Sequence, residues 1–145
     1  MRTHRLTFRF PVPGGERVGG AWEVAWQGCR VMGILNATPD SFSDGGRHYA
    51  LQSALETAKH MQQAGVFMLD IGGESTRPGA VRVEAQEEAD RVVPVIQALH
   101  EQGIRTSVDT MRASVAAAAA AAGVDMINDV SGGLADPEMY AAMAD

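Results

Sequence analysis

Apolar residues along the chain form a strand-and-helix pattern that repeats from residue 31 onward. Four short apolar runs have the character of strands buried on both faces, namely 31–36, 66–73, 104–110 and 124–133. Each run is followed by a segment with helical spacing or helix-forming composition, namely 50–65, 83–103, 112–123 and 136–145. The pattern therefore predicts four consecutive strand–helix units.

The ends of the expected helices carry recognisable signals. Gly65 and Gly103 are placed to end the first two helices, because glycine readily adopts the conformation that follows a helix. Asp136 and Pro137 are expected at the N-cap and the first position of the fourth helix. Pro94 lies inside the second helical pattern and is expected to kink it.

Alternating strands and helices predict a parallel sheet, which is either an open doubly wound sheet or a barrel. The four runs end in polar residues: Asn36, Asp70, Asp109, and Asn128 with Asp129. In a barrel every strand ends at one mouth, whereas in an open sheet only the strands near the switch point contribute to a site. Four polar ends favour an α/β fold of the (β/α) TIM-barrel type, with about the first four βα units present. Residues 1–30 are expected to form an N-terminal arm or short hairpin, and residues 31–145 the first half of the barrel.

Composition limits the possible partners. The chain has 145 residues, of which 46% are hydrophobic and 21% charged, as in one ordinary globular domain. Its net charge of −6 shows no electrostatic footprint for nucleic acid. No charge-free apolar stretch is long enough to span a membrane, and no signal peptide is evident. The single Cys29 fits a reducing compartment, so a cytoplasmic protein is expected.

The polar strand ends belong to longer motifs that follow in order along the chain. They are "NATPDSFSDGG" at 36–46, "DIGGESTRPGA" at 70–80, "SVDT" at 107–110 and "INDVSGG" at 127–133. Together these motifs resemble the dihydropteroate synthase family of folate biosynthesis, whose pterin-binding barrel has eight strands. Ala37 stands where that family usually has Val.

The resemblance implies a magnesium-dependent transferase that is a homodimer at full length and a target of sulfonamides. Its substrates would be 6-hydroxymethyl-7,8-dihydropterin pyrophosphate and para-aminobenzoate, and its products 7,8-dihydropteroate and pyrophosphate. Because the family's later strands bring further groups to the site, residues 1–145 alone are expected to be inactive. They are also expected to self-associate or to belong to a longer chain.

Asp109 and Asn128 match the family's pterin-binding positions and are also candidate catalytic residues. A carboxylate suits a pterin edge with neighbouring N–H donors, and an amide offers both a donor and an acceptor. Two simpler interpretations stay open: Asp109 caps the third helix, and Asn128 binds its own backbone in a turn.

The first two loops supply the remaining candidates. Asn36 matches the family position linked to Mg²⁺ and pyrophosphate, and Mg²⁺ commonly completes its oxygen shell with waters and phosphates. Thr76 and the candidate catalytic residue Arg77 match a loop that contacts the substrates, and the cation of Arg77 could offset the charge of pyrophosphate or of the aminobenzoate carboxylate. The alternative for Arg77 is a solvated loop charge. Phe42, Thr76 and Pro78 match the aminobenzoate pocket. The alternative for Phe42 is permanent packing on the barrel rim.

Two other functions remain open at this point. One is a methyltetrahydrofolate-binding methyltransferase domain, whose barrel also holds a pterin. The other is a non-catalytic half-barrel that binds a pterin or a partner chain. The loops containing Phe42 and Arg77 favour the synthase over the methyltransferase, since they suit pyrophosphate and aminobenzoate. The four His residues are scattered and suggest no Ser–His–Asp or Cys–His site.

Overall fold

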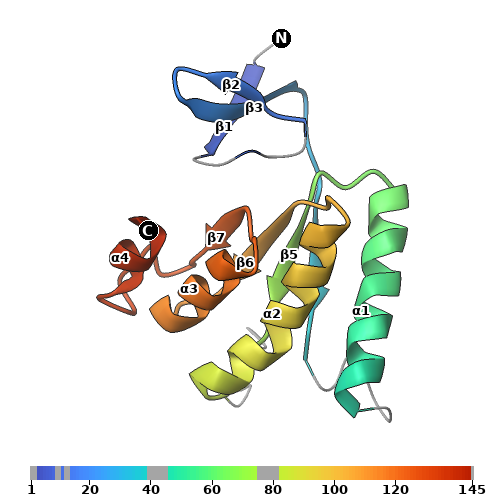
Figure 1. The fold of residues 1–145 in the computed structure, drawn as a ribbon, viewed down its shortest axis with the longest axis vertical. Coiled ribbons are helices and arrows are strands. Elements are labelled where there is room, and N and C mark those ends of the chain that lie inside the picture. The colour runs from blue at the N-terminus through green and yellow to red at the C-terminus, as the bar shows by residue number, and fades with distance from the viewer. Residues whose placement is uncertain (1–2, 9–10, 12–13, 39–45, 75–81, 145) are drawn as a thin grey trace.

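The computed structural model describes residues 3–8, 11, 14–38, 46–74 and 82–144, which form two sheets and flanking helices (Figure 1). The N-terminal sheet is antiparallel, with strand order β1-β3-β2. Its strands are β1 (Thr3–Phe8), β2 (Glu16–Val18) and β3 (Ala21–Gln27). Residues 1–30 were expected to form an arm or short hairpin, and the structure has three strands in this part of the chain.

The second sheet is parallel and has the strand order β4-β5-β6-β7, which is the order along the chain. Its strands are β4 (Met32–Asn36), β5 (Met68–Gly72), β6 (Thr106–Asp109) and β7 (Met126–Asn128). An open doubly wound sheet reverses its order at a switch point, whereas a barrel adds each strand beside the previous one. The observed order is that of a barrel.

The helices cover one side of this sheet. They are α1 (Gly46–Gln63), α2 (Ala85–Glu101), α3 (Ala113–Ala121) and α4 (Met139–Ala144). Each helix contacts the next one along the chain, as expected when all of them line the same side (Figure 1). The buried core beneath them joins Leu35, Ile71 and Val108 of the strands to residues of the helices. On the opposite side, Ile34 is 67% exposed. The fold is thus α/β and corresponds to the first four βα units of a TIM barrel.

The helix ends follow the expected chemistry, with one shift. Gly65 and Gly103, each two residues beyond the end of α1 or α2, adopt left-handed φ angles of 89° and 69°. The second helix, α2, is continuous through Pro94. The fourth helix starts at Met139, two residues later than Pro137, because a turn precedes it. Asp136 stabilises that turn, since its Oδ1 accepts a hydrogen bond of 3.0 Å from the backbone N–H of Glu138.

The N-terminal sheet packs against the amino ends of the parallel strands. The rings of Trp26 in β3 and Phe67 just before β5 have centroids 5.1 Å apart. The guanidinium of Arg105, just before β6, lies 4.7 Å from the centroid of the same Phe67 ring. The opposite, carboxyl end of the strands is therefore where a site can open. Among the described residues, no helix has both the length and the apolar composition needed to cross a bilayer.

Candidate active site at the carboxyl ends of the parallel strands

Three of the predicted site residues lie in one row across the parallel sheet. The strand register places Asn36 beside Gly72, Gly72 beside Asp109, and Asp109 beside Asn128. The preceding residues on β4, β5 and β6 belong to the core under the helices, so the row faces the helix-free side. Asp109 and Asn128 are half-buried, and Asn36 is exposed at the end of the row.

A buried carboxylate lies one layer below this row. Asp70 on β5 is only 7% exposed, and its Oδ2 accepts a hydrogen bond of 2.9 Å from Nδ2 of Asn128. A carboxylate can only accept, so this contact defines which end of the Asn128 amide is the nitrogen. The amide oxygen then points away from Asp70. Asn128 is thus bound to a distant strand, which contradicts the alternative that its side chain serves its own turn.

Two polar atoms in the same layer have no hydrogen-bond partner in the described structure. They are Oδ1 of Asp70 and Oγ of Ser107, which is paired with Asp70 in the strand register. Buried polar atoms without partners are rare and mark places where water or a ligand completes the bonding. The layer therefore offers an acceptor and a hydroxyl to the helix-free side of the sheet.

Ionisation of the Asp109 carboxyl is less favourable than for an ordinary aspartate. Burial raises the pKa of its carboxyl above the ordinary value, and repulsion from Asp70, Glu88 and Asp129 raises it further. A ligand that donates hydrogen bonds to the ionised carboxylate would relieve this cost. The arrangement of Asp109 and Asn128 therefore suits a planar ligand with adjacent N–H donors.

The alternative in which Asp109 caps α3 does not hold. The backbone N–H of Ala113 donates to Oδ2 of Asp136 at 2.8 Å, and that of Arg112 donates to Oγ1 of Thr110 at 3.2 Å. Two N–H groups at the start of this helix are thus bound by side chains other than that of Asp109. Asp109 is left on the face of the sheet that carries the row.

Asp129, by contrast, stabilises the turn after β7. Its Oδ1 accepts hydrogen bonds from the backbone N–H and the hydroxyl of Ser131, at 2.8 and 2.7 Å. Its Oδ2 accepts one of 2.8 Å from the backbone N–H of Gly133. Partial burial alone would raise the pKa of Asp129, but these hydrogen bonds outweigh it and lower the pKa. The structural role considered for this residue is thus the one its contacts show.

Arg112 lies near the site and was not among the predicted residues. It donates from Nη1 to Oε2 of Glu74 at 2.8 Å and to Glu88, and from Nη2 to the carbonyl oxygen of Val83 at 2.6 Å. Burial would lower the pKa of Arg112, but the two carboxylates outweigh this and raise it. One sequence signal was available: Glu88 lies one helical turn before Val92, so it places a charge on the buried face of α2.

Several predicted residues cannot be placed. Phe42, Thr76, Arg77 and Pro78 lie outside the described residues. Within the described part of the chain, no group of three or more His, Cys, Asp or Glu side chains is arranged to bind a metal ion. The amide of Asn36 remains the candidate ligand for Mg²⁺, and its Oδ1 lies over Gly72 in the row.

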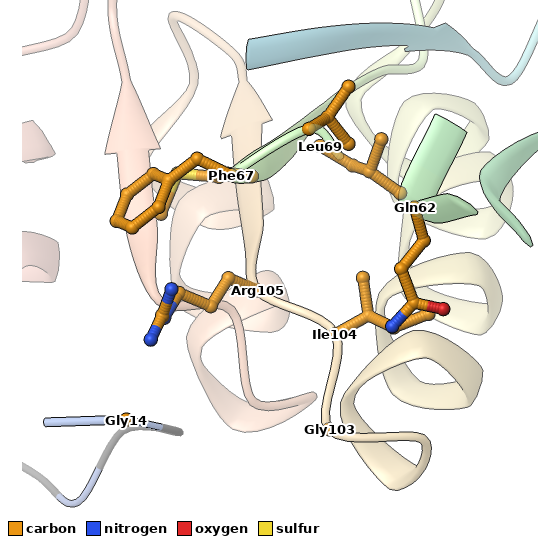
Figure 2. A pocket seen from close by; sticks show the side chains of 9 residues that line it. Gly14, Gln62, Phe67, Leu69, Gly103, Ile104 and Arg105 are labelled. Carbon is orange, nitrogen blue, oxygen red and sulfur yellow. The ribbon is translucent and has the colours of Figure 1, made fainter. Parts of the chain in front are cut away.

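A cavity of about 310 Å³ lies at the amino ends of the parallel strands, opposite the end that carries the site (Figure 2). Its lining includes Gly14 from the N-terminal segment, Gln62 near the end of α1, and Phe67 and Arg105 just before β5 and β6. None of the predicted site residues lines it. In TIM-barrel enzymes the chemistry occurs at the carboxyl ends of the strands, so this cavity is not the candidate active site.

Comparison with known families agrees with the geometry. Residues 32–145 match the family described as pterin binding enzyme. The chain belongs to the pterin-binding enzyme family. Among members of this family, it is 54% identical over 115 residues to the dihydropteroate synthase of Synechocystis sp., which covers 79% of this chain. It is 53% identical over 116 residues to the dihydropteroate synthase of Bacillus subtilis.

Solved structures of pterin-binding enzymes share the fold. The dihydropteroate synthase of Xanthomonas albilineans with 4-aminobenzoic acid has a TM-score of 0.74 and 50% identity, covering 80% of this chain and 43% of that one. The Burkholderia cenocepacia dihydropteroate synthase complexed with 7,8-dihydropteroate has a TM-score of 0.74 and 43% identity, covering 85% of this chain and 40% of that one. The chain spans 40% of the Synechocystis protein and 41% of the Bacillus protein.

Proposed function

We propose that this chain supplies the pterin-binding half of a dihydropteroate synthase, which joins 6-hydroxymethyl-7,8-dihydropterin pyrophosphate to para-aminobenzoate. The observation that carries the proposal is the row of Asn36, Asp109 and Asn128 on the helix-free side of the sheet. Identities near 50% to named dihydropteroate synthases support this activity over methyl transfer. None of these comparisons extends over the whole length of the related enzymes.

In this proposal Asp109 and Asn128 bind the pterin ring. The ionised Asp109 accepts two neighbouring N–H groups of the ring, and such paired charged hydrogen bonds define both position and orientation. Asn128 presents its amide oxygen to a further donor, because Asp70 binds its amide nitrogen. The pterin methylene carbon is thereby held above the strand ends, where the second substrate approaches.

Asn36 is proposed as the protein's ligand for Mg²⁺. Its amide oxygen is the kind of hard ligand that Mg²⁺ prefers, and it lies at the exposed end of the row, where phosphate and water oxygens can complete the shell. When bound, the ion would neutralise charge that develops on the departing pyrophosphate. This assignment rests on the donor type and on the family resemblance.

The segment after β5 is proposed to contact both substrates. Thr76 and the candidate catalytic residue Arg77 would bind pyrophosphate or the aminobenzoate carboxylate, with the cation offsetting negative charge. Phe42, Thr76 and Pro78 would form the walls of the aminobenzoate pocket, where an aromatic side chain covers an apolar ring. These four residues lie outside the described part of the chain, so their roles rest on the motifs.

The proposed reaction is a displacement at the pterin methylene carbon. The bond from this carbon to the pyrophosphate oxygen breaks, and the aminobenzoate nitrogen forms the new C–N bond. The pterin ring, held by Asp109 and Asn128, shares the positive charge that develops on carbon. The arylamine nitrogen is already a nucleophile, so no strong base is required, and its proton is lost after attack.

We also propose that the full-length protein works as a homodimer in the cytoplasm. The dimer rests on the family resemblance, and the compartment fits an exposed, unpaired Cys29. The function is tested by incubating the full-length protein with both substrates and following dihydropteroate and pyrophosphate release. Pterin binding without condensation would favour a non-catalytic binding protein. Methyl transfer from methyltetrahydrofolate to a corrinoid protein would favour the methyltransferase.

A further inference from the structure

Two buried polar side chains are neighbours in the layer below the row of Asn36, Asp109 and Asn128. They are Asp70 and Ser107, which the strand register pairs across β5 and β6. Ser107 is fully buried and Asp70 is 7% exposed. Among the described residues, neither Oδ1 of Asp70 nor Oγ of Ser107 has a hydrogen-bond partner. Because buried polar atoms are nearly always paired, we expect one partner that serves both atoms.

The side chains on either side of this pair are apolar. The register places Ile34 of β4 beside Asp70, and Met126 of β7 beside Ser107. Asp70 and Ser107 face the helix-free side, because the next residue on each of their strands belongs to the core under the helices. In this layer of four residues, the hydroxyl of Ser107 is therefore the side-chain group that can serve Oδ1 of Asp70.

The spacing of the strands suits one water molecule between the two atoms. Neighbouring strands lie about 4.8 Å apart, and a water molecule with two hydrogen bonds of about 2.8 Å spans nearly the same distance. A buried water molecule needs at least two polar partners. Here it would donate to the carboxylate oxygen and exchange its second hydrogen bond with the hydroxyl, which can donate or accept.

The other oxygen of Asp70 orients a proposed pterin ligand. Oδ2 accepts a hydrogen bond of 2.9 Å from Nδ2 of Asn128, which leaves the amide oxygen of Asn128 for the pterin ring. The terminal torsion of an aspartate is broad, so a carboxylate that is bound at one oxygen can still turn. A second contact at Oδ1 fixes both oxygens and thereby the direction of the Asn128 amide.

We propose that Ser107 is a positioning residue for pterin binding: its hydroxyl and Oδ1 of Asp70 hold one buried water molecule, which fixes the carboxylate that orients Asn128. The inference rests on the proposed synthase function, in which Asn128 binds the pterin ring. Ser107 does not itself touch the substrate. It acts through the water molecule, Asp70 and Asn128 in turn.

The test compares substitutions of Ser107 in the full-length protein. Ser107→Ala removes the hydroxyl without adding volume. Ser107→Thr and Ser107→Val add side chains of the same shape at this buried position, but only threonine keeps the hydroxyl. Thr106→Val is the matched control, because Oγ1 of Thr106 is also buried and has no partner among the described residues. Thr106 precedes Ser107 on β6 and therefore lies on the opposite face of the sheet.

Ser107→Ala is expected to weaken pterin binding roughly threefold to tenfold, as for the loss of one intramolecular hydrogen bond. Ser107→Thr should bind the pterin more tightly than Ser107→Val by a similar factor, a difference that filling of space alone would not produce. Thr106→Val should bind as the wild type does. Calorimetric titration with the pterin pyrophosphate, without aminobenzoate, measures each affinity. At saturating pterin, the KM for aminobenzoate should match the wild type in every variant.

A high-resolution crystal structure of the full-length protein gives a direct readout. It should show one water molecule within about 3 Å of both Oγ of Ser107 and Oδ1 of Asp70. A side chain in that place, or no shared water, would overturn the proposal, as would equal pterin affinities of Ser107→Thr and Ser107→Val.

These outcomes are distinct from a failure of the proposed function. If the wild type makes dihydropteroate and the Ser107 variants bind the pterin as tightly as it does, the positioning role is wrong and the synthase function stands. If the wild type binds the pterin but makes no dihydropteroate, the function is wrong. The shared water and the difference between Ser107→Thr and Ser107→Val would then still assign Ser107 its role in pterin binding.

Discussion

The amide nitrogen of Asn128 donates a hydrogen bond of 2.9 Å to the buried carboxylate of Asp70, across 58 residues of sequence. This contact joins the ends of two strands that are not neighbours in the sheet, since β6 lies between β5 and β7. It defines the orientation of the Asn128 amide, and Asp70 is one of the groups that, after burial, raise the pKa of Asp109. Asp70 therefore influences both proposed pterin ligands without itself being one of them.

Replacing Asp70 by alanine is expected to weaken pterin binding. Asn128 would lose the contact that defines its orientation, and a hydrogen bond to a charged group contributes about 1.5–3 kcal/mol. We therefore expect a loss of pterin binding free energy of about 1–3 kcal/mol in the full-length protein, measured by calorimetric titration.

Asp125→Ala is the matched control for this substitution. Oδ2 of Asp125 accepts a hydrogen bond of 2.8 Å from the backbone N–H of Thr106, at the amino end of the sheet. This variant should lose stability but keep its pterin affinity. Equal losses of affinity in both variants would indicate a general disturbance of the sheet, and the role given to Asp70 would then be wrong.

Asp109→Asn is expected to have a larger effect on pterin binding. An amide places a donor where the carboxylate had an acceptor, so one ring N–H group loses its partner. The expected loss is about 2–5 kcal/mol of binding free energy, as for a broken buried charged contact. Asp129→Asn is the comparison at the next strand end, because Asp129 stabilises a turn. A folded Asp109→Asn protein with wild-type pterin affinity would contradict the assignment.

The sequence pattern predicted the barrel order because buried parallel strands and amphipathic helices leave a periodic signal. It also predicted that Asn36, Asp109 and Asn128 would lie along one edge of the sheet, since the carboxyl ends of parallel strands are on the same edge. Asp70 was recognised as a polar strand end, but its contact with Asn128 depends on strand register. Parallel strands are joined by long crossover connections, so no short turn between them specifies which residues become neighbours.

The Arg112 network was not predicted for a related reason. Its partner Glu74 lies just after β5, and Glu88 lies in the first turn of α2. Its third partner, Val83, lies in the chain just before α2. Contacts of this kind depend on how a helix packs on the sheet, which periodicity alone does not specify. The third strand of the N-terminal sheet, Glu16–Val18, was also missed because it is short, exposed and flanked by glycines.

Pterin binding is expected to weaken on acidification, at a higher pH than for an ordinary aspartate. Binding requires ionised Asp109, and burial together with Asp70, Glu88 and Asp129 raises its pKa. As pH falls through this raised pKa, the carboxyl takes up a proton and no longer accepts two N–H groups. Asp70→Asn removes one of the repelling charges, which lowers the pKa of Asp109. The acid limb of a plot of pterin affinity against pH should therefore move to lower pH.

The same titration has a built-in comparison. The substitution Glu101→Gln changes an exposed carboxylate at the end of α2, far from the strand ends that carry the site. It alters net charge by the same amount as Asp70→Asn but should leave the acid limb where it is. A shift of equal size in both variants would mean that overall charge, rather than the charge beside Asp109, determines the pH dependence.

Phe42→Ala and Pro78→Ala are expected to act on the second substrate. As proposed walls of the aminobenzoate pocket, each should raise the KM for aminobenzoate by roughly tenfold or more, since even one methylene group in an apolar pocket contributes about tenfold. Pterin affinity should be little changed. Val18→Ala removes an apolar side chain that is 48% exposed on the N-terminal sheet and serves as the control. Parallel losses for both substrates would point instead to destabilised loops.

On the helix-free side of the parallel sheet, β4 carries exposed apolar side chains below the polar row. Met32 and Ile34 of β4 are 40% and 67% exposed there. In the described structure β4 and β7 are also the outer strands of the sheet, so each has one edge without a strand beside it. Exposed apolar strand edges readily pair with other chains.

A polypeptide limited to residues 1–145 is therefore expected to self-associate and to lack synthase activity. Light scattering at increasing concentration should show species larger than a monomer, and an assay with both substrates should show no dihydropteroate. Ile34→Lys places a charge on the helix-free side next to the outer edge and should shift association to higher concentration. Val18→Lys adds the same charge to the N-terminal sheet and should not. A monomeric polypeptide with full turnover would show that the open strands need no partner and that the groups on these four strands suffice for the reaction.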